Sequence, residues 1–103
     1  MSNGLDELFH GTTRLRIAAF LSGSDEAEFR AVQEYCELSK SALSKNASVL
    51  EEAGYVAVRK GYVGKWPRTW LSLTESGRRA LAGHLDALRR IADTASKRAG
   101  AGG

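Results

Sequence analysis

The spacing of hydrophobic residues along this 103-residue chain changes twice, from a helical period to an alternating one and back again. Apolar residues recur at helical spacing between residues 5 and 21, and the small polar residues at 22–25 predict a loop. We expect a short leader there, followed by a helix with Thr12 as its N-cap. A minimal strand at residues 28–29 and a two-turn helix at 31–36 complete the predicted N-terminal third.

Residues 39–53 carry the most regular helical pattern. Ser39 is a suitable N-cap, and Gly54 stands where helices often end in a left-handed conformation. On a helical wheel the apolar side chains gather on one side and leave a polar face opposite. Together with the helix before it, this segment predicts a helix-turn-helix unit. The polar face consists of Lys40, Ser41, Ser44, Lys45 and Ser48.

After Gly54 the pattern becomes typical of strands. Residues 55–60 are rich in strand formers, and residues 68–73 alternate so that Leu71 and Leu73 share one face. The connector at 61–67 holds two glycines and the only proline of the chain. We therefore expect a hairpin with a long tip and not a tight two-residue turn.

A last helix is predicted from residue 75 to about residue 95, with Thr74 as its N-cap. Residues 96–103 are small, basic and glycine-rich, so we expect a flexible tail after a single domain that covers residues 1–95. The apolar positions of the helix step by four and three, a spacing that suits packing against a partner helix. They are Leu81, Leu85, Leu88, Ala92 and Ala95.

The composition is that of an ordinary globular domain, with 26% charged and 43% apolar residues. No apolar run approaches the roughly 18 residues of a membrane helix, so no membrane partner is expected. The N-terminus carries acids where a signal peptide would have a basic and then an apolar region, which favours a cytoplasmic location. The single cysteine, Cys36, cannot form an internal disulfide, in agreement with a reducing compartment.

The net charge of +3 is distributed unevenly along the chain. Residues 1–38 hold three arginines and seven acids, a balance of −4, whereas residues 39–73 hold six basic residues and two acids, a balance of +4. No acid occurs between Ala53 and Thr74. A polyanion that approached this middle segment would meet no local repulsion.

The polar face of the 39–53 helix is unusual because it uses serine where longer side chains have better helix propensity. Short hydroxyl side chains suit a helix that lies close to base edges in a DNA major groove, with Lys40 and Lys45 placed for phosphates. The face taken alone is equally compatible with an ordinary solvated surface. Asn46 falls beside the apolar arc, where it is either buried with hydrogen-bond partners or at the edge and able to reach a phosphate.

Two stretches of the sequence show a resemblance that includes all of these predicted elements. The segment "LSKSALSKNASVLEEAGYVAVRKG", followed by "KWPRTWLSLTESGRRAL", resembles the MarR-like winged-helix transcriptional regulators, especially their short one-domain relatives. The resemblance covers about residues 8–93. It implies a mainly α fold with a small β wing (α+β), a winged helix-turn-helix in which residues 39–53 form the recognition helix.

The resemblance also implies how DNA would be bound. The recognition helix would enter the major groove, and Lys60, Lys65 and Arg68 of the wing would follow the backbone or enter the minor groove. We assign DNA binding to nine residues in all, which are Ser39, Lys40, Ser41, Ser44, Lys45, Ser48, Lys60, Lys65 and Arg68.

Members of this family are usually homodimers joined through their terminal helices, which implies a palindromic binding site. The chain is shorter than typical members and leaves little room for an effector pocket, so no small-molecule effector is assigned. We place Leu5, Leu8, Leu81, Leu85, Leu88 and Ala92 at the dimer interface and expect His84 to flank it.

Several residues allow two interpretations. Trp66 and Trp70 either stack on sugars or bases, or pack on the sheet or a partner subunit. Cys36 is either a redox-sensing thiol or a structural residue, and the acids next to it favour the structural role because they raise the pKa of a thiol. His10 and His84 lie far apart with no cysteine cluster, so we expect no metal site and no cofactor.

An enzyme is not expected, because the sequence has no phosphate-binding glycine loop, nucleophile motif or paired carboxylates. The remaining alternative to a DNA-binding regulator is a winged helix that acts as a protein-interaction module. Such a module would more often expose apolar residues on its wing and helix face.

Overall fold

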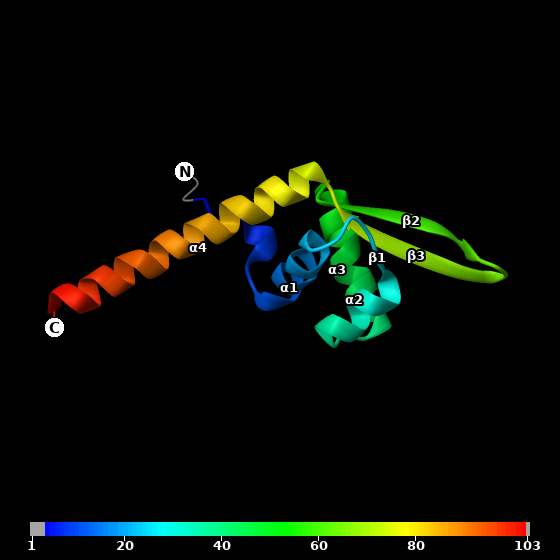
Figure 1. Ribbon diagram of the computed structural model, residues 1–103, viewed down its shortest axis with the longest axis horizontal. Coiled ribbons are helices and arrows are strands. Elements are labelled where there is room, and N and C mark those ends of the chain that lie inside the picture. The colour runs from blue at the N-terminus through cyan, green and yellow to red at the C-terminus, as the bar shows by residue number, and fades with distance from the viewer. Residues whose placement is uncertain (1–3, 103) are drawn as a thin grey trace.

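The computed structural model describes residues 4–102 of the chain. Three short helices gather at its centre, a β hairpin projects at one end, and half of a long helix projects at the other (Figure 1). The molecule measures 63 × 26 × 22 Å as a result. In chain order the elements are η1 (Glu7–Phe9), α1 (Thr12–Ser22), β1 (Ala27–Glu28), α2 (Phe29–Cys36), α3 (Lys40–Glu52), β2 (Val56–Val63), β3 (Trp66–Leu73) and α4 (Glu75–Gly102).

The core lies where α1, α2, α3, the sheet and the first half of α4 meet. Burying a leucine or isoleucine side chain there stabilises the fold by roughly 1.5–3 kcal/mol. Since α3 turns Leu43, Ala47 and Leu50 inward, its opposite face is left to solvent. The largest fully buried side chains are Phe9, Ile17, Leu21, Val32, Leu43, Leu50 and Leu71.

Local hydrogen bonds confirm both predicted ends of α3. At the start, the Ser39 hydroxyl accepts a hydrogen bond of 3.1 Å from the backbone N–H of Ala42. At the end, Gly54 has a φ of 82°, and the N–H of Tyr55 donates to the carbonyl of Leu50 at 2.9 Å. This is the Schellman arrangement, which glycine favours because it tolerates positive φ.

The sheet has three antiparallel strands in the order β1-β3-β2. β1 pairs with only two residues of β3, whereas β2 and β3 pair from Val56 and Leu73 at the base to Val63 and Trp66 at the outer end. Leu71 and Leu73 share the buried face, as predicted. We call the β2–β3 hairpin the wing, and its outer half extends beyond β1 and the helices (Figure 1).

The prediction of a long hairpin tip is wrong. Both strands continue through the connector and are joined by a two-residue turn at Gly64 and Lys65. Gly64 has a φ of 63° and Lys65 a negative one, the sign pattern of a type II′ turn. Pro67 is tolerated because its pair with Tyr62 follows the hydrogen-bonded pair that closes the turn, so its missing N–H would point away from β2.

The predicted ends of two helices also need correction. Gly11, with a φ of 118°, occupies the N-cap position of α1, and Thr12 is the first helical residue. α4 continues past residue 95 to Gly102, because alanine, lysine and arginine in this segment are strong helix formers. Residues 1–3 of the predicted domain and residue 103 of the predicted tail lie outside the described residues. Despite the length of α4, no helix within residues 4–102 is both long and apolar enough to cross a membrane.

α4 begins against the base of the wing. The Thr74 hydroxyl accepts a hydrogen bond of 2.9 Å from the backbone N–H of Gly77, which confirms the predicted cap, and donates one of 2.6 Å to the carbonyl of Gly54. A Cβ on Gly77 would overlap the backbone carbonyl of Tyr55. The close packing of α4 on the loop after α3 therefore requires glycine at this position.

Candidate nucleic-acid interface

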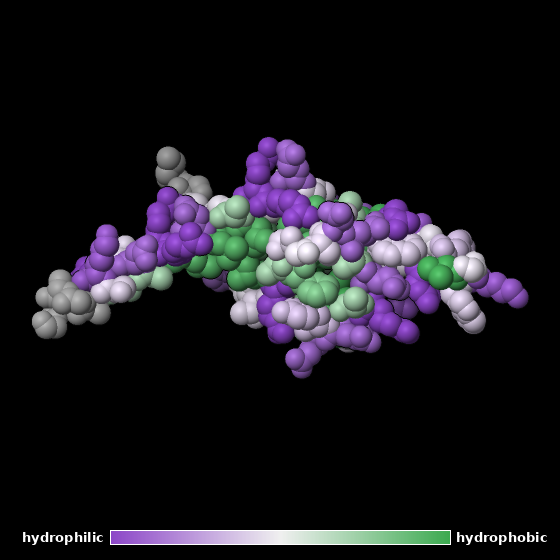
Figure 2. Space-filling model, in the orientation of Figure 1, coloured by the Kyte–Doolittle hydropathy of each residue, from purple (hydrophilic) through white to green (hydrophobic). Residues whose placement is uncertain are grey.

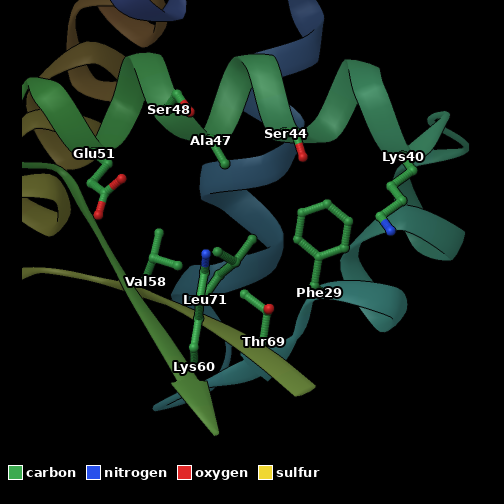
Figure 3. Close-up of a pocket in the computed structure, with 10 residues that line it drawn as sticks. All are labelled: Phe29, Lys40, Ser44, Ala47, Ser48, Glu51, Val58, Lys60, Thr69 and Leu71. Carbon is green, nitrogen blue, oxygen red and sulfur yellow. The ribbon is translucent and has the colours of Figure 1, made fainter. Parts of the chain in front are cut away.

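An open groove of about 600 Å³ separates α3 from the wing (Figure 3). Ser44 and Ser48 line it on the α3 side. The ammonium groups of Lys40, from α3, and Lys60, from β2, both point into it, and the carboxylate of Glu51 lies at the end away from Lys40 (Figure 3). Cations from two separate elements therefore share one concave surface with serine hydroxyls.

The helical wheel divided α3 correctly into buried and exposed sides. Its contact with DNA remains a prediction, but all the side chains assigned to that contact are accessible. Ser39 is exposed as well, although its hydroxyl caps the helix and is less available to a ligand. The exposed residues within α3 are Lys40, Ser41, Ser44, Lys45 and Ser48, followed in its last turn by Glu51 and Glu52.

Asn46 joins α3 to α1 and does not belong to the exposed face. Its side-chain N–H donates to the carbonyl of Ala42 at 2.8 Å, and its side-chain oxygen accepts a hydrogen bond of 3.1 Å from Arg14. Arg14 also donates to the carbonyl of Leu8 at 2.6 Å. Of the two interpretations of Asn46, the structure favours the one in which protein groups satisfy its amide.

The three predicted wing cations have different surroundings. Lys60 faces the groove, and Lys65 is exposed in the turn at the end of the wing. The guanidinium of Arg68 instead lies 2.9 Å from the carboxylate of Glu28 and donates to the carbonyl of Pro67. Because an acid partner offsets its charge, Arg68 is a weaker candidate for a phosphate contact than either lysine.

Arg59 covers Trp70 on the face of the wing that is turned away from the groove. Its guanidinium carbon lies 4.0 Å from the ring centre, within cation–π range. Hydrogen bonds of 2.7 and 2.8 Å join the same guanidinium to the carboxylate of Glu26, and they lower the pKa of that carboxylate. Trp70 thus has the structural role considered for it, whereas Trp66 is exposed.

A second hollow adjoins the groove at the start of α3. Arg30 and Gln33 of α2 line it together with Lys40 and Arg68. In helix-turn-helix proteins the first helix crosses the DNA backbone, so Arg30 and Gln33 are further candidates for phosphate contacts. Neither residue was assigned to DNA binding from the sequence, although their place on the first helix of the predicted helix-turn-helix unit was a usable signal.

The residues predicted on the α4 seam separate into buried and exposed ones. Leu81 lies in the core of the chain, because this part of α4 packs on the domain, and so is not part of an exposed seam. Leu85 and Leu88 are 40% and 39% exposed, and Ala92 is exposed as well. Ile91, which is 53% exposed, was missed although it follows Leu88 at helical spacing.

The two N-terminal leucines predicted at the dimer interface also lie in different places. Leu5 lines a hollow with Leu88 of α4, whereas Leu8 lines a different hollow with residues of α3, so of these two leucines Leu5 alone adjoins the exposed seam. His84, which was expected to flank that seam, lines the same hollow as Leu5 and Leu88. Its side chain is buried, and its Nδ1 accepts a hydrogen bond of 3.0 Å from the backbone N–H of Asp6.

Cys36 packs in the core. Burial, more than the neighbouring acids named from the sequence, raises the pKa of its thiol, and the charge of Arg16 offsets only part of this effect. A thiol of this kind is a poor nucleophile at neutral pH, which suits a structural role. Among residues 4–102 no group of three or more His, Cys, Asp and Glu side chains is arranged to hold a metal ion.

Known proteins share both the sequence and the fold. A family model described as a winged helix DNA-binding domain matches residues 13–92. The uncharacterized protein MJ0432 of Methanocaldococcus jannaschii is 28% identical to this chain over 79 residues, which span 77% of this chain and 86% of that protein.

Two solved structures are similar to this chain in fold. A transcriptional regulator homologue from Pyrococcus horikoshii OT3 aligns with a TM-score of 0.80 at 27% identity, over 86% of this chain and 88% of that chain. A MarR family transcriptional regulator from Silicibacter pomeroyi aligns with a TM-score of 0.62 at 22% identity, over 89% of this chain and 57% of that chain, and shows likeness of fold alone. The MarR-like fold expected from the sequence is confirmed, and the chain belongs to the family of winged helix DNA-binding domains.

Proposed function

We propose that this protein is a transcriptional regulator that binds a specific double-stranded DNA sequence as a homodimer. α3 lies in the major groove, and the wing follows the backbone or enters the neighbouring minor groove. The observation that carries the proposal is the groove between α3 and the wing, into which Lys40 and Lys60 both point beside serine hydroxyls. Membership of the winged helix DNA-binding family supports the same function.

The size and chemistry of α3 suit a major groove. An α-helix with its side chains is about 10–12 Å across, and the major groove is about 12 Å wide. The exposed serines of α3 are short enough to let its backbone approach the base edges, and each offers a donor and acceptors. Lys40 and Lys45 are exposed beside them, where phosphates border the groove.

The exposed second half of α4 supports the homodimer. Residues 88–98 are all exposed. An unpacked helix shorter than about 12–15 residues is marginal in water, so the projecting half of α4 is expected to need a partner. A second copy of the chain presents the same stripe and satisfies twofold symmetry. The apolar side chains that continue the buried stripe of the first half are Leu88, Ile91, Ala92 and Ala95.

Twofold symmetry of the protein would be repeated in its binding site. Each protomer contributes one α3, so the two half-sites form a palindrome. Their centres are expected about 34 Å apart, one turn of the duplex, or a multiple of that distance.

A protein-interaction module is the second candidate, and one observation favours it. Tyr62 and Trp66 near the end of the wing are 73% and 67% exposed, and aromatic side chains are enriched in protein interfaces. The same end carries Lys65, however, and no acid occurs between Ala53 and Thr74. A polyanion suits this charge better than an average protein surface does, so DNA binding is the preferred function.

Fluorescence anisotropy with labelled duplexes tests the proposal. Binding should weaken steeply as salt is raised, because lysine contacts release counterions from the DNA. Lys65→Ala should weaken all duplexes alike and reduce the salt slope by about one, whereas Ser44→Ala should change the preference among duplexes. If no duplex is bound even at low salt, DNA binding is excluded. If both variants have the same effect, the division of roles between α3 and the wing is wrong.

A further inference from the structure

The wing tip, which we define as residues 62–67, is apolar on both faces of the hairpin. Tyr62 is paired with Pro67 on the face that is turned toward the groove, and Val63 is paired with Trp66 on the opposite face. Tyr62, Val63 and Trp66 are 73%, 53% and 67% exposed. Figure 2 shows a hydrophobic spot near the outer end of the wing, bordered mainly by surface of intermediate hydropathy.

The domain itself does not need these side chains for its stability. The wing contributes to the core through residues at its base, such as Val56, Leu71 and Leu73. Farther out, the described contacts of the hairpin are mainly those between its two strands. Single exposed apolar side chains are ordinary, but a cluster of aromatic ones at the end of a projecting hairpin indicates a binding partner.

The arrangement of the tip favours a narrow slot over a flat surface. A hairpin that lies on a flat partner needs apolar side chains on one face only, whereas one that enters a slot contacts a wall on each side. Lys65 forms the apex together with Gly64, and no acid lies within the wing. A slot with anionic rims fits this combination, and the minor groove of DNA is such a slot.

The length of the wing suits a tip that reaches that groove. Gly64 in the turn lies four positions beyond Lys60, which faces α3, and four steps at roughly 3.3 Å each span about 13 Å. The neighbouring minor groove lies about half a turn, roughly 17 Å, from the centre of the major groove. The side chains of the tip bridge most of the remaining distance.

We propose that the wing tip enters the minor groove as an apolar wedge, in which Trp66 partly unstacks a base step and bends the DNA toward the major groove. The inference rests on the proposed DNA binding and adds a residue that contributes to specificity. A sheet with side chains on both faces is about 10 Å thick, whereas the minor groove of B-DNA is about 6 Å wide. The groove must widen to admit the tip, and apolar wedges of this kind kink the duplex.

A wedge of this kind selects DNA by its deformability. Pyrimidine–purine steps such as TA and CA unstack more easily than other steps, so sites that carry one beneath the wing tip should bind more tightly. The preference would arise at base pairs that α3 does not contact.

Fluorescence of Trp66 tests insertion directly. The chain has two tryptophans, so Trp70→Phe leaves Trp66 as the single reporter. Stacking on a nucleobase quenches indole fluorescence, and saturation with a bound duplex should therefore quench the emission strongly. Unchanged emission on a duplex that anisotropy shows to be bound would overturn the wedge and leave the proposed function intact.

DNA bending supplies the second test. Energy transfer between dyes at the two ends of the duplex should reveal a bend of at least about 20° with the wild-type protein. Trp66→Ala should reduce both the bend and the affinity, the latter about tenfold, whereas Lys65→Ala should reduce affinity and keep the bend. Equal bending by wild type and Trp66→Ala would contradict the inference. If the wild type binds no duplex, the proposed function fails, and the inference fails with it.

Discussion

Arg14 donates a hydrogen bond of 3.1 Å to the side-chain oxygen of Asn46 and so ties α1 to α3. The same guanidinium donates to the carbonyl of Leu8 in the N-terminal segment. The orientation of α3 therefore depends on a polar link in addition to its apolar face. Asn46 supports α3 from the side of α1, and the alternative considered from the sequence, a phosphate contact from the edge of the apolar arc, is not favoured.

Asn46→Ala is expected to lower the free energy of unfolding by about 1–2 kcal/mol, because it leaves a partly buried guanidinium N–H without its partner. Urea denaturation measures the change. Ser44→Ala is the matched control in the same helix, and its exposed side chain should alter stability by less than about 0.5 kcal/mol. Unchanged stability in Asn46→Ala together with lost DNA binding would show that Asn46 contacts DNA.

Two glycines of α4 should respond in opposite directions to the same substitution. Gly77→Ala is expected to destabilise the fold by about 1–3 kcal/mol, because the added methyl group would overlap the Tyr55 carbonyl and lie 2.9 Å from Cδ1 of Leu73. Gly83→Ala should stabilise it by about 0.5–1 kcal/mol, since open space surrounds that position and alanine favours the helix. Thermal unfolding compares the two variants, and a shift of the same sign in both would contradict the packing of α4 on the loop at Tyr55.

The ion pair of Glu26 and Arg59 should make the free energy of unfolding depend on pH. Hydrogen bonds from Arg59 lower the pKa of Glu26 in the folded state. The pair therefore stabilises the fold above the ordinary pKa of a glutamate, about 4.3, and this contribution is lost as the pH falls through the lowered value. Wild type should be slightly more stable than Glu26→Gln near neutral pH, and the difference should vanish in strong acid. Urea denaturation at several pH values tests this, and a difference that does not change with pH would contradict it.

A charged side chain placed on the exposed stripe of α4 is expected to prevent dimerisation. Ile91→Lys is expected to give monomers by light scattering, because it places an ammonium group in the proposed helix–helix contact. Asp93→Lys introduces the same group on the other side of α4 and should leave the dimer intact. A dimeric Ile91→Lys variant would place the interface elsewhere.

Local signals in the sequence were sufficient for most of the fold. The N-caps Ser39 and Thr74 and the helix end at Gly54 act through hydrogen bonds to residues a few positions away, so their meaning does not depend on the rest of the chain. The wing tip was misjudged because two glycines and Pro67 in the connector predicted a loop. Whether proline breaks a strand depends on which pair it occupies, and register is set by the whole hairpin.

The candidate site depended more on tertiary contacts. Periodicity separated the exposed serines and lysines of α3 from its buried face, but it gave no sign that Arg68 is paired with Glu28. Helical spacing also grouped Leu81 with Leu85, although the domain covers only the former. Which part of an apolar stripe stays exposed is decided by elements that are distant in sequence.

Selection from a pool of random duplexes, with sequencing of the bound fraction, tests the central claim most directly. We expect enrichment of a palindromic motif whose half-sites are about one helical turn apart or a multiple of that distance, because each protomer presents one α3. The same motif should lose its enrichment when the selection uses Ile91→Lys, if dimerisation sets the spacing. A bound fraction with the same sequence distribution as the starting pool would contradict sequence-specific recognition.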